Sequence, residues 1–166
     1  MNALGTGLIG CDAALIWYDG GARCGRFLHK YQLNMDTQII VETARATLAG
    51  TIAFPEVVAK LLAAGVEYYH VDYVTLRKTF YGASGGIVIS PIDYEGLPAV
   101  AADFDAKRLR AAILDSQQHG QKYRDFTRRV MEAGVQGYFA FLRGKRVTYL
   151  GRTGDQHTER FPGAAP

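Results

Sequence analysis

The chain has 166 residues, of which 48% are hydrophobic and 21% are charged, and its formal net charge is +3. This length suits one domain that buries about two-thirds of its unfolded surface, and the composition is that of an ordinary globular protein, which excludes disorder throughout. No run approaches the roughly 18 apolar residues that a transmembrane helix needs, so we expect no membrane association.

The first 34 residues differ from the rest of the chain. They contain both cysteines, Cys11 and Cys24, whose spacing fits no zinc site, so we expect no metal. Because the chain has so few cysteines, we expect a reducing, cytoplasmic location. We also expect no cofactor. No secretory signal is expected, because the segment before Cys11 lacks a positively charged start and an apolar stretch. Since Met35 directly precedes a helix signal, we interpret residues 1–34 as a disordered or misannotated extension and Met35 as the physiological start.

Two helices are predicted next. Asp36 caps the first and Gly50 ends it, whereas Pro55 stands at the first position of the second and Gly65 stops it. Strands follow at Tyr68–Tyr73, Thr79–Gly82 and Ile87–Ser90, where aromatic and β-branched residues are frequent.

The second half repeats this order. Asp103 is expected to cap a third helix, and a fourth covers about Tyr123–Glu132. Val135–Leu142 and Arg146–Gly151 are predicted to form a hairpin, and His157–Phe161 a short edge strand.

A shift of 69 positions places residues 54–85 on residues 123–154 without a gap. The triplet Ala-Gly-Val occurs in both copies, and matches lie on either side of it. The coinciding residues include Tyr69/Tyr138, Arg77/Arg146, Thr79/Thr148, Gly82/Gly151 and Gly85/Gly154.

Neither copy could bury both its helices and its sheet alone, so we expect the copies to share one sheet. The predicted fold is a two-layer α+β domain over residues 35–163, with four helices on one face of a mainly antiparallel sheet of five or six strands. The duplicated helix-helix-hairpin unit covers about 37–90 and 104–161. Two separate lobes are the alternative.

The segments EAGVQGY (132–138) and YLGRTGDQHTERFP (149–162) resemble the domain-of-unknown-function family 1398. The family is also called YdfO-like, and its members are often labelled phage envelope protein. The similarity runs from about Thr37 to Pro162. It implies a small cytoplasmic bacterial α+β protein, with some prophage-encoded relatives and no established activity.

Positions where one copy is polar and the other apolar are candidate sites. His70 and Asp72 alternate toward one strand face, whereas Phe139 and Phe141 occupy the matching positions. A histidine beside a carboxylate suits acid–base catalysis or metal binding, and a solvated sheet face is the simpler interpretation.

A second polar cluster follows the last strong strand. Arg152 and Arg160 are candidate ligand-binding residues, since arginine with His157 could hold an anion, and His157 with Glu159 is a second candidate catalytic pair. An ion-pair network that fixes the end of the chain to the sheet is the alternative.

Several tyrosines lie on the predicted strands. Tyr69, Tyr81 and Tyr138 are candidate ligand-binding residues if they share an open face, where they would form an aromatic groove for a planar ligand, a peptide or a partner subunit. Packing in the core is the alternative.

Basic residues outnumber acidic ones only in residues 105–166, which makes nucleic acid an alternative partner, although no reading motif is present. Our leading hypothesis is a non-enzymatic binding or regulatory protein that engages an unknown protein or small ligand. A small enzyme using the His/carboxylate pairs and a weak nucleic-acid binder are the alternatives. The open edges of the sheet also permit a homodimer.

Overall fold

Both predicted helices of the first half are present in the computed structural model, which describes residues 35–163. Helix α1 (Thr37–Ala49) begins after Asp36, whose carboxylate accepts a hydrogen bond from the Ile39 N–H at 3.0 Å, and ends at Gly50 with φ of 67°. Helix α2 (Phe54–Ala63) begins one residue before Pro55, which therefore stands in its first turn but not at its first position. The caps therefore set the limits of α1 as predicted.

Three antiparallel strands complete this half: β1 (Val66–Asp72), β2 (Arg77–Gly82) and β3 (Ile87–Pro91). The second half contains α3 (Ala106–His119), α4 (Tyr123–Glu132), β4 (Val135–Phe141), β5 (Arg146–Gly151) and β6 (Gln156–Arg160).

One cap prediction was wrong. Asp105, not Asp103, caps α3, because its carboxylate accepts hydrogen bonds from the N–H groups of Lys107 at 3.0 Å and Arg108 at 2.9 Å. The carbonyl of Asp103 instead lies close to Gly134, at the start of β4.

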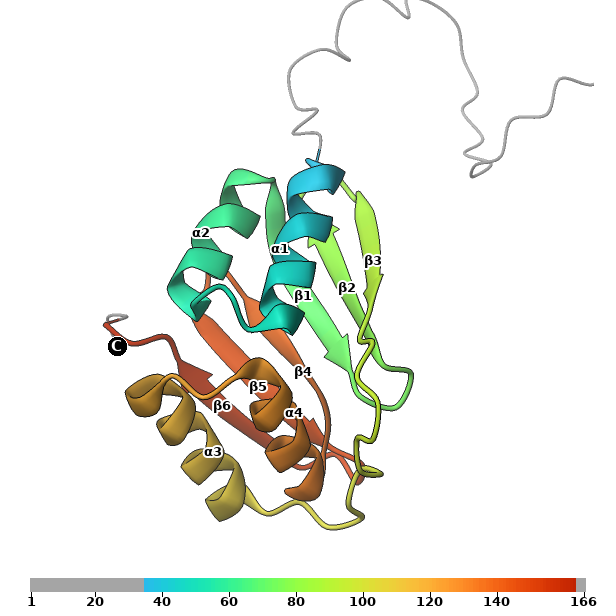
Figure 1. Ribbon diagram of the computed structural model, residues 1–166, viewed down its shortest axis with the longest axis vertical. Helices are drawn as coiled ribbons and strands as arrows, with labels where there is room; N and C mark the ends of the chain where they lie inside the picture. Colours follow the sequence, from blue (N-terminus) through green and yellow to red (C-terminus); the bar gives the residue numbers. More distant parts are fainter. Residues whose placement is uncertain (1–34, 164–166) are drawn as a thin grey trace, which may run out of the picture. The chain divides into compact units, whose positions relative to one another are not determined.

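The six strands form one antiparallel sheet in the order β3-β2-β1-β4-β5-β6, so the halves meet where β1 pairs with β4. Figure 1 shows both helix pairs on the same face of this sheet. The predicted α+β architecture, with helices packed on an antiparallel sheet, is therefore confirmed.

We call the helix-covered side of the sheet the inner face and the opposite side the outer face. Strand residues alternate between them, and the inner face supplies much of the buried core. On the outer face, half-buried rings form a ladder across the strands, in which Tyr68 stacks on Tyr81 at 4.6 Å and His70 on Phe139 at 4.3 Å between ring centroids.

Backbone details recur at the same offset of 69 positions. Gly65 and Gly134 both have φ of 81°, and the turn residues Leu76 and Lys145 have φ of 51° and 47°. The carbonyls of these turn residues each accept a hydrogen bond from the residue directly after the third strand of their half, Leu76 from Ile92 at 2.8 Å and Lys145 from Phe161 at 2.9 Å. The two halves share a backbone plan, while their origin by duplication stays a prediction.

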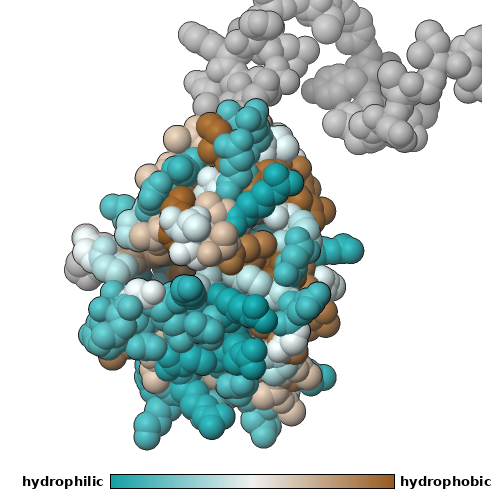
Figure 2. Space-filling view, in the orientation of Figure 1, coloured by the Kyte–Doolittle hydropathy of each residue, from teal (hydrophilic) through white to brown (hydrophobic). Residues whose placement is uncertain are grey.

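The surface above the helices is not uniform. Figure 2 shows hydrophilic side chains gathered over α3 and α4, whereas hydrophobic atoms are visible around α1, α2 and β3. Within residues 35–163 no helix is long and apolar enough to span a membrane. The predicted N-terminal extension, residues 1–34, lies outside the described residues.

Candidate functional site

A cavity of about 580 Å³ lies between the two helix pairs, against the inner face of the sheet. Strands from both halves form its floor. Residues of the four helices also line it, together with three connecting segments: residues 50–53 between α1 and α2, residues 120–122 between α3 and α4, and residues 161–162 after β6. The cavity therefore depends on both halves of the fold.

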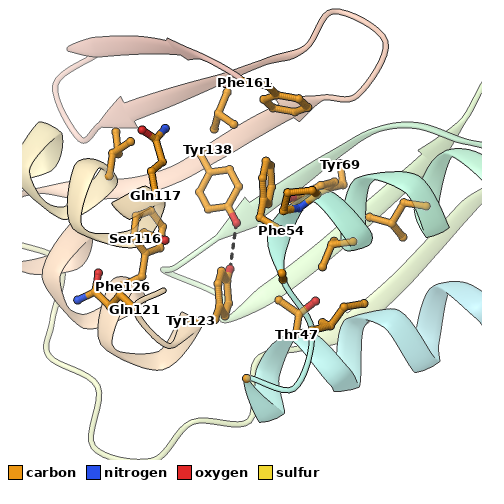
Figure 3. A pocket seen from close by; sticks show the side chains of 18 of the residues that line it. Thr47, Phe54, Tyr69, Ser116, Gln117, Gln121, Tyr123, Phe126, Tyr138 and Phe161 are labelled. Carbon is orange, nitrogen blue, oxygen red and sulfur yellow. Dashed lines mark hydrogen bonds between the residues drawn. The ribbon is translucent and has the colours of Figure 1, made fainter. Parts of the chain in front are cut away.

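Aromatic rings from both halves contribute to the lining, as Figure 3 shows. Tyr123 at the start of α4 and Tyr138 on β4 point toward one another, and their hydroxyls form a hydrogen bond of 3.0 Å. Phe54 of α2 meets Phe161 edge to face, with 5.1 Å between ring centroids. Burial raises the pKa of the Tyr69, Tyr138 and Tyr149 phenols, so these phenols are uncharged at neutral pH.

Lys78 is the unexpected residue of this lining. It lies on the inner face of β2 between its strand neighbours Val71 and Ser90, and only 3% of its surface is exposed. Its Nζ atom lies 4.0 Å from the centroid of the Tyr123 ring, a cation–π contact. Among residues 35–163 no carboxylate forms a salt bridge with it, and desolvation lowers the pKa of the Lys78 amine to about 7.

Our sequence reasoning missed Lys78, although the repeat contained the signal. The 69-residue offset matches Lys78 with Val147, which is a polar position opposite an apolar one, the same criterion that selected His70. Both side chains lie on the inner face, where Val147 is 7% exposed and fills the core. The packing of the core therefore does not explain why a lysine occupies the matching position.

Polar groups line the cavity elsewhere. The Oε1 atom of Gln121 is buried and has no hydrogen-bond partner among the described residues. Lys122, Glu159 and Arg160 also contribute to the lining, and Lys122 and Arg160 are exposed residues.

The predicted ligand-binding residues separate into two groups. Tyr69, Tyr138 and Arg160 line the cavity. Tyr81 lies on the outer face against Tyr68, and Arg152 lies in the exposed turn after β5. The tyrosines therefore do not form one groove, because the alternation of strand residues places them on opposite faces.

His70 and Asp72 lie on the outer face, away from the cavity. The Asp72 carboxylate accepts hydrogen bonds from the Val74 N–H at 2.8 Å and the Thr75 N–H at 3.2 Å, which fixes the turn between β1 and β2. Desolvation lowers the pKa of His70, and the nearby charge of Asp72 opposes this shift. The bonds of Asp72 give it a structural role in this turn.

His157 and Glu159 lie on β6, opposite the inner-face residues Tyr149 and Val147. The Nε2 atom of His157 is 3.3 Å from Oε2 of Glu159. The two predicted catalytic pairs thus lie on opposite faces of the sheet, and the structure does not bring them together.

The basic residues of the second half are partly engaged within the fold. Arg129 forms an ion pair with Asp115, and Nη2 of Arg124 donates to the carbonyl of Glu95 at 2.8 Å. In the described part of the chain, no group of three His, Cys, Asp or Glu side chains is placed to hold a metal ion.

Comparison with known proteins gives a family but no activity. No curated protein matches the chain. Residues 51–159, more than half of the chain, match the model of the family described as "Protein of unknown function (DUF1398)". The chain therefore belongs to the domain-of-unknown-function family 1398.

Proposed function

We propose that this protein is a non-enzymatic binding protein that holds a small molecule with a flat, apolar body in the cavity between its helix pairs. The observation that supports this most directly is the cavity itself, at about 580 Å³ and with eight aromatic side chains among the lining residues described. Pockets that bind small molecules have volumes of roughly 300–1,000 Å³, mostly apolar walls and a few polar groups.

Imperfect packing is a poor explanation for a space of this size. Protein interiors are packed about as densely as organic crystals, with few voids larger than a water molecule. The cavity also contains a buried amine without a carboxylate partner among the described residues. Such a group destabilises a fold unless something contacts it.

The alternatives have weaker support. Acid–base catalysis by the predicted pairs lacks a shared site, because His70 and Glu159 lie on opposite faces of the sheet. Nucleic-acid binding is less well supported because two of the basic residues, Arg124 and Arg129, form contacts within the fold. A ligand between the helix pairs would contact both halves, which suits a regulatory role. Phage association, bacterial origin and cytoplasmic location stay predictions.

Differential scanning calorimetry with an uncharged flat probe, 2-naphthamide, tests the proposal. A probe that binds only the folded state at ten times its Kd adds about 1.4 kcal/mol to the free energy of unfolding. For a domain of this size we expect the Tm to rise by roughly 4 °C.

Ser116→Trp supplies the structural control, because Ser116 of α3 lines the cavity. The indole should fill part of the space and abolish the rise in Tm. Gln118→Trp places the same side chain at an exposed position of the same helix and should leave the rise intact. The proposal is contradicted if flat probes give no rise, or if Ser116→Trp preserves it.

A further inference from the structure

We infer that the ligand of this cavity is an aromatic carboxylate, and that Lys78 binds its carboxylate group. This inference rests on the proposed function and adds the chemical class of the ligand. Three features of the cavity support it: the charged residues of its lining, the position of the amine, and the aromatic surface of its floor.

The charged residues of the lining favour an anion. Lys122 and Arg160 contribute two cations and Lys78 a titratable amine, whereas Glu159 is the one acidic residue among the lining residues described. Glu159 is itself within hydrogen-bond distance of His157. Exposed cations near an opening attract anions, while a deep cation can bind them with little screening by salt.

The position of Lys78 indicates where the negative charge of the ligand would lie. An isolated buried ammonium is costly, and the amine of Lys78 avoids part of this cost by losing its proton near neutral pH. The Tyr123 ring contacts one side of the amine and leaves its remaining N–H groups without a charged acceptor among residues 35–163. A ligand carboxylate would supply that acceptor and restore the charged form of the amine.

The floor of the cavity suits a planar ring with an acceptor group. Tyr69, Phe80 and Tyr149 contribute aromatic surface from three strands. The hydroxyls of Tyr123 and Tyr138 bond to one another, and the hydroxyls of Tyr69, Tyr73 and Thr127 interact with them, so this part of the floor meets its own hydrogen-bonding needs. A carboxylate accepts hydrogen bonds only, and so it complements the lysine rather than the phenols.

Isothermal titration calorimetry of the full chain with two matched probes tests the inference. 2-Naphthoate and 2-naphthamide share the same rings and differ in charge. At pH 6.5 we expect naphthoate to bind the wild-type protein at least ten-fold more tightly than naphthamide. Lys78→Met should reduce this preference to less than two-fold. Lys60→Met, which removes an exposed lysine of α2 that pairs with Glu56, should leave the preference unchanged.

Proton uptake gives a second, independent measurement. At pH 8, in buffers of different ionisation enthalpy, each naphthoate bound should take up more than half a proton, because binding restores the charge of Lys78. The phenols of Tyr69, Tyr123, Tyr138 and Tyr149 face this region and stay neutral, since burial raises their pKa values. His157, Glu159, Lys122 and Arg160 are the other charged or titratable groups near the cavity, and Lys78→Met retains all of them while losing the uptake.

The outcomes separate the two proposals. Equal affinity for both probes, or a charge preference that survives in Lys78→Met, would overturn the inference and leave a binding cavity in place. Failure of both probes to bind would contradict the proposed function itself. A naphthoate preference that is lost in Lys78→Met and accompanied by proton uptake supports both.

Discussion

Residues 37–91 and residues 106–160 use the same order of helices and strands, the same strand pairing and the same turn conformations, yet they differ where side chains meet the cavity. The first half contributes Lys78 to the floor, and the second half contributes Val147 at the matching position. The second half also supplies Phe161, whose counterpart Ile92 is buried in the core.

This difference separates two requirements within one fold. Residues that are alike in both halves, such as Gly65 and Gly134, maintain the backbone. Residues that differ, such as Lys78 and Val147, are free of that requirement and can serve a ligand. Substitutions at shared positions should therefore affect the stability of the fold, and substitutions at differing positions should affect the binding of a ligand.

The largest expected effect concerns Gly134. A Cβ atom there would lie 2.1 Å from the carbonyl oxygen of Asp103, in the segment that joins the halves. Gly134→Ala should lower the free energy of unfolding by roughly 3–4 kcal/mol, from the positive φ and the displaced backbone together. Urea denaturation measures this loss. Gly120→Ala, at φ of 64° with open space around it, should cost only about 1 kcal/mol.

Replacing Lys78 would make the halves more alike. Lys78→Met removes an amine whose desolvation destabilises the fold, so the free energy of unfolding at pH 7 should rise by about 2–3 kcal/mol. Val147→Met adds the same side chain without removing a charge and should change stability by less than about 1.5 kcal/mol. A destabilised Lys78→Met would show that the amine is part of the packed core.

The same substitution has a defined pH dependence. The pKa of Lys78 is lowered to about 7 in the folded protein, from 10.5. The unfolded chain therefore binds more protons between pH 7 and pH 10.5, and the penalty for burying this amine falls as the pH rises through that window. The stabilisation by Lys78→Met should be greatest at or below pH 7 and should decline steadily toward pH 9.5. A constant difference between variant and wild type would contradict the lowered pKa.

A smaller effect is expected at Tyr123, which matches Phe54 of the first half. Tyr123→Phe makes the starts of α2 and α4 alike but removes the hydroxyl that bonds to Tyr138, and should cost about 1 kcal/mol. Tyr68→Phe, on the outer face, should cost less than half as much. Equal losses in thermal unfolding would mean that the Tyr123–Tyr138 bond contributes nothing specific.

The turn residues should give the smallest changes. Leu76 and Lys145 each adopt a positive φ without being glycine. Lys145 is exposed, so Lys145→Gly should raise the free energy of unfolding by about 0.5 kcal/mol, because relief of strain slightly exceeds the added entropy of the unfolded chain. Leu76 packs partly buried against the core, so Leu76→Gly also loses apolar burial and should lower the free energy of unfolding by about 0.5 kcal/mol. A loss of stability in Lys145→Gly would show that its turn is not strained.

Much of the fold was predictable because its signals are local. Asp36, Gly50 and Pro55 mark helix ends through contacts within a few residues, and the repeat indicated one shared sheet. The prediction that Asp103 caps α3 was wrong because a second aspartate, Asp105, follows two residues later. Spacing alone does not tell which of the two caps the helix. The cavity was not predictable, since it depends on how side chains from distant strands fill the space between two helix pairs.

The two edges of the sheet have different consequences for association between chains. Strand β6 is a polar edge that contains His157, Glu159 and Arg160, and such charged edges discourage the pairing of strands between molecules. Strand β3 is protected chiefly by Pro91 at its end, and its Ile87 and Ile89 are 60% and 58% exposed. Any self-association at high protein concentration should therefore begin at β3, and a lysine introduced at position 89 should improve solubility without affecting the cavity.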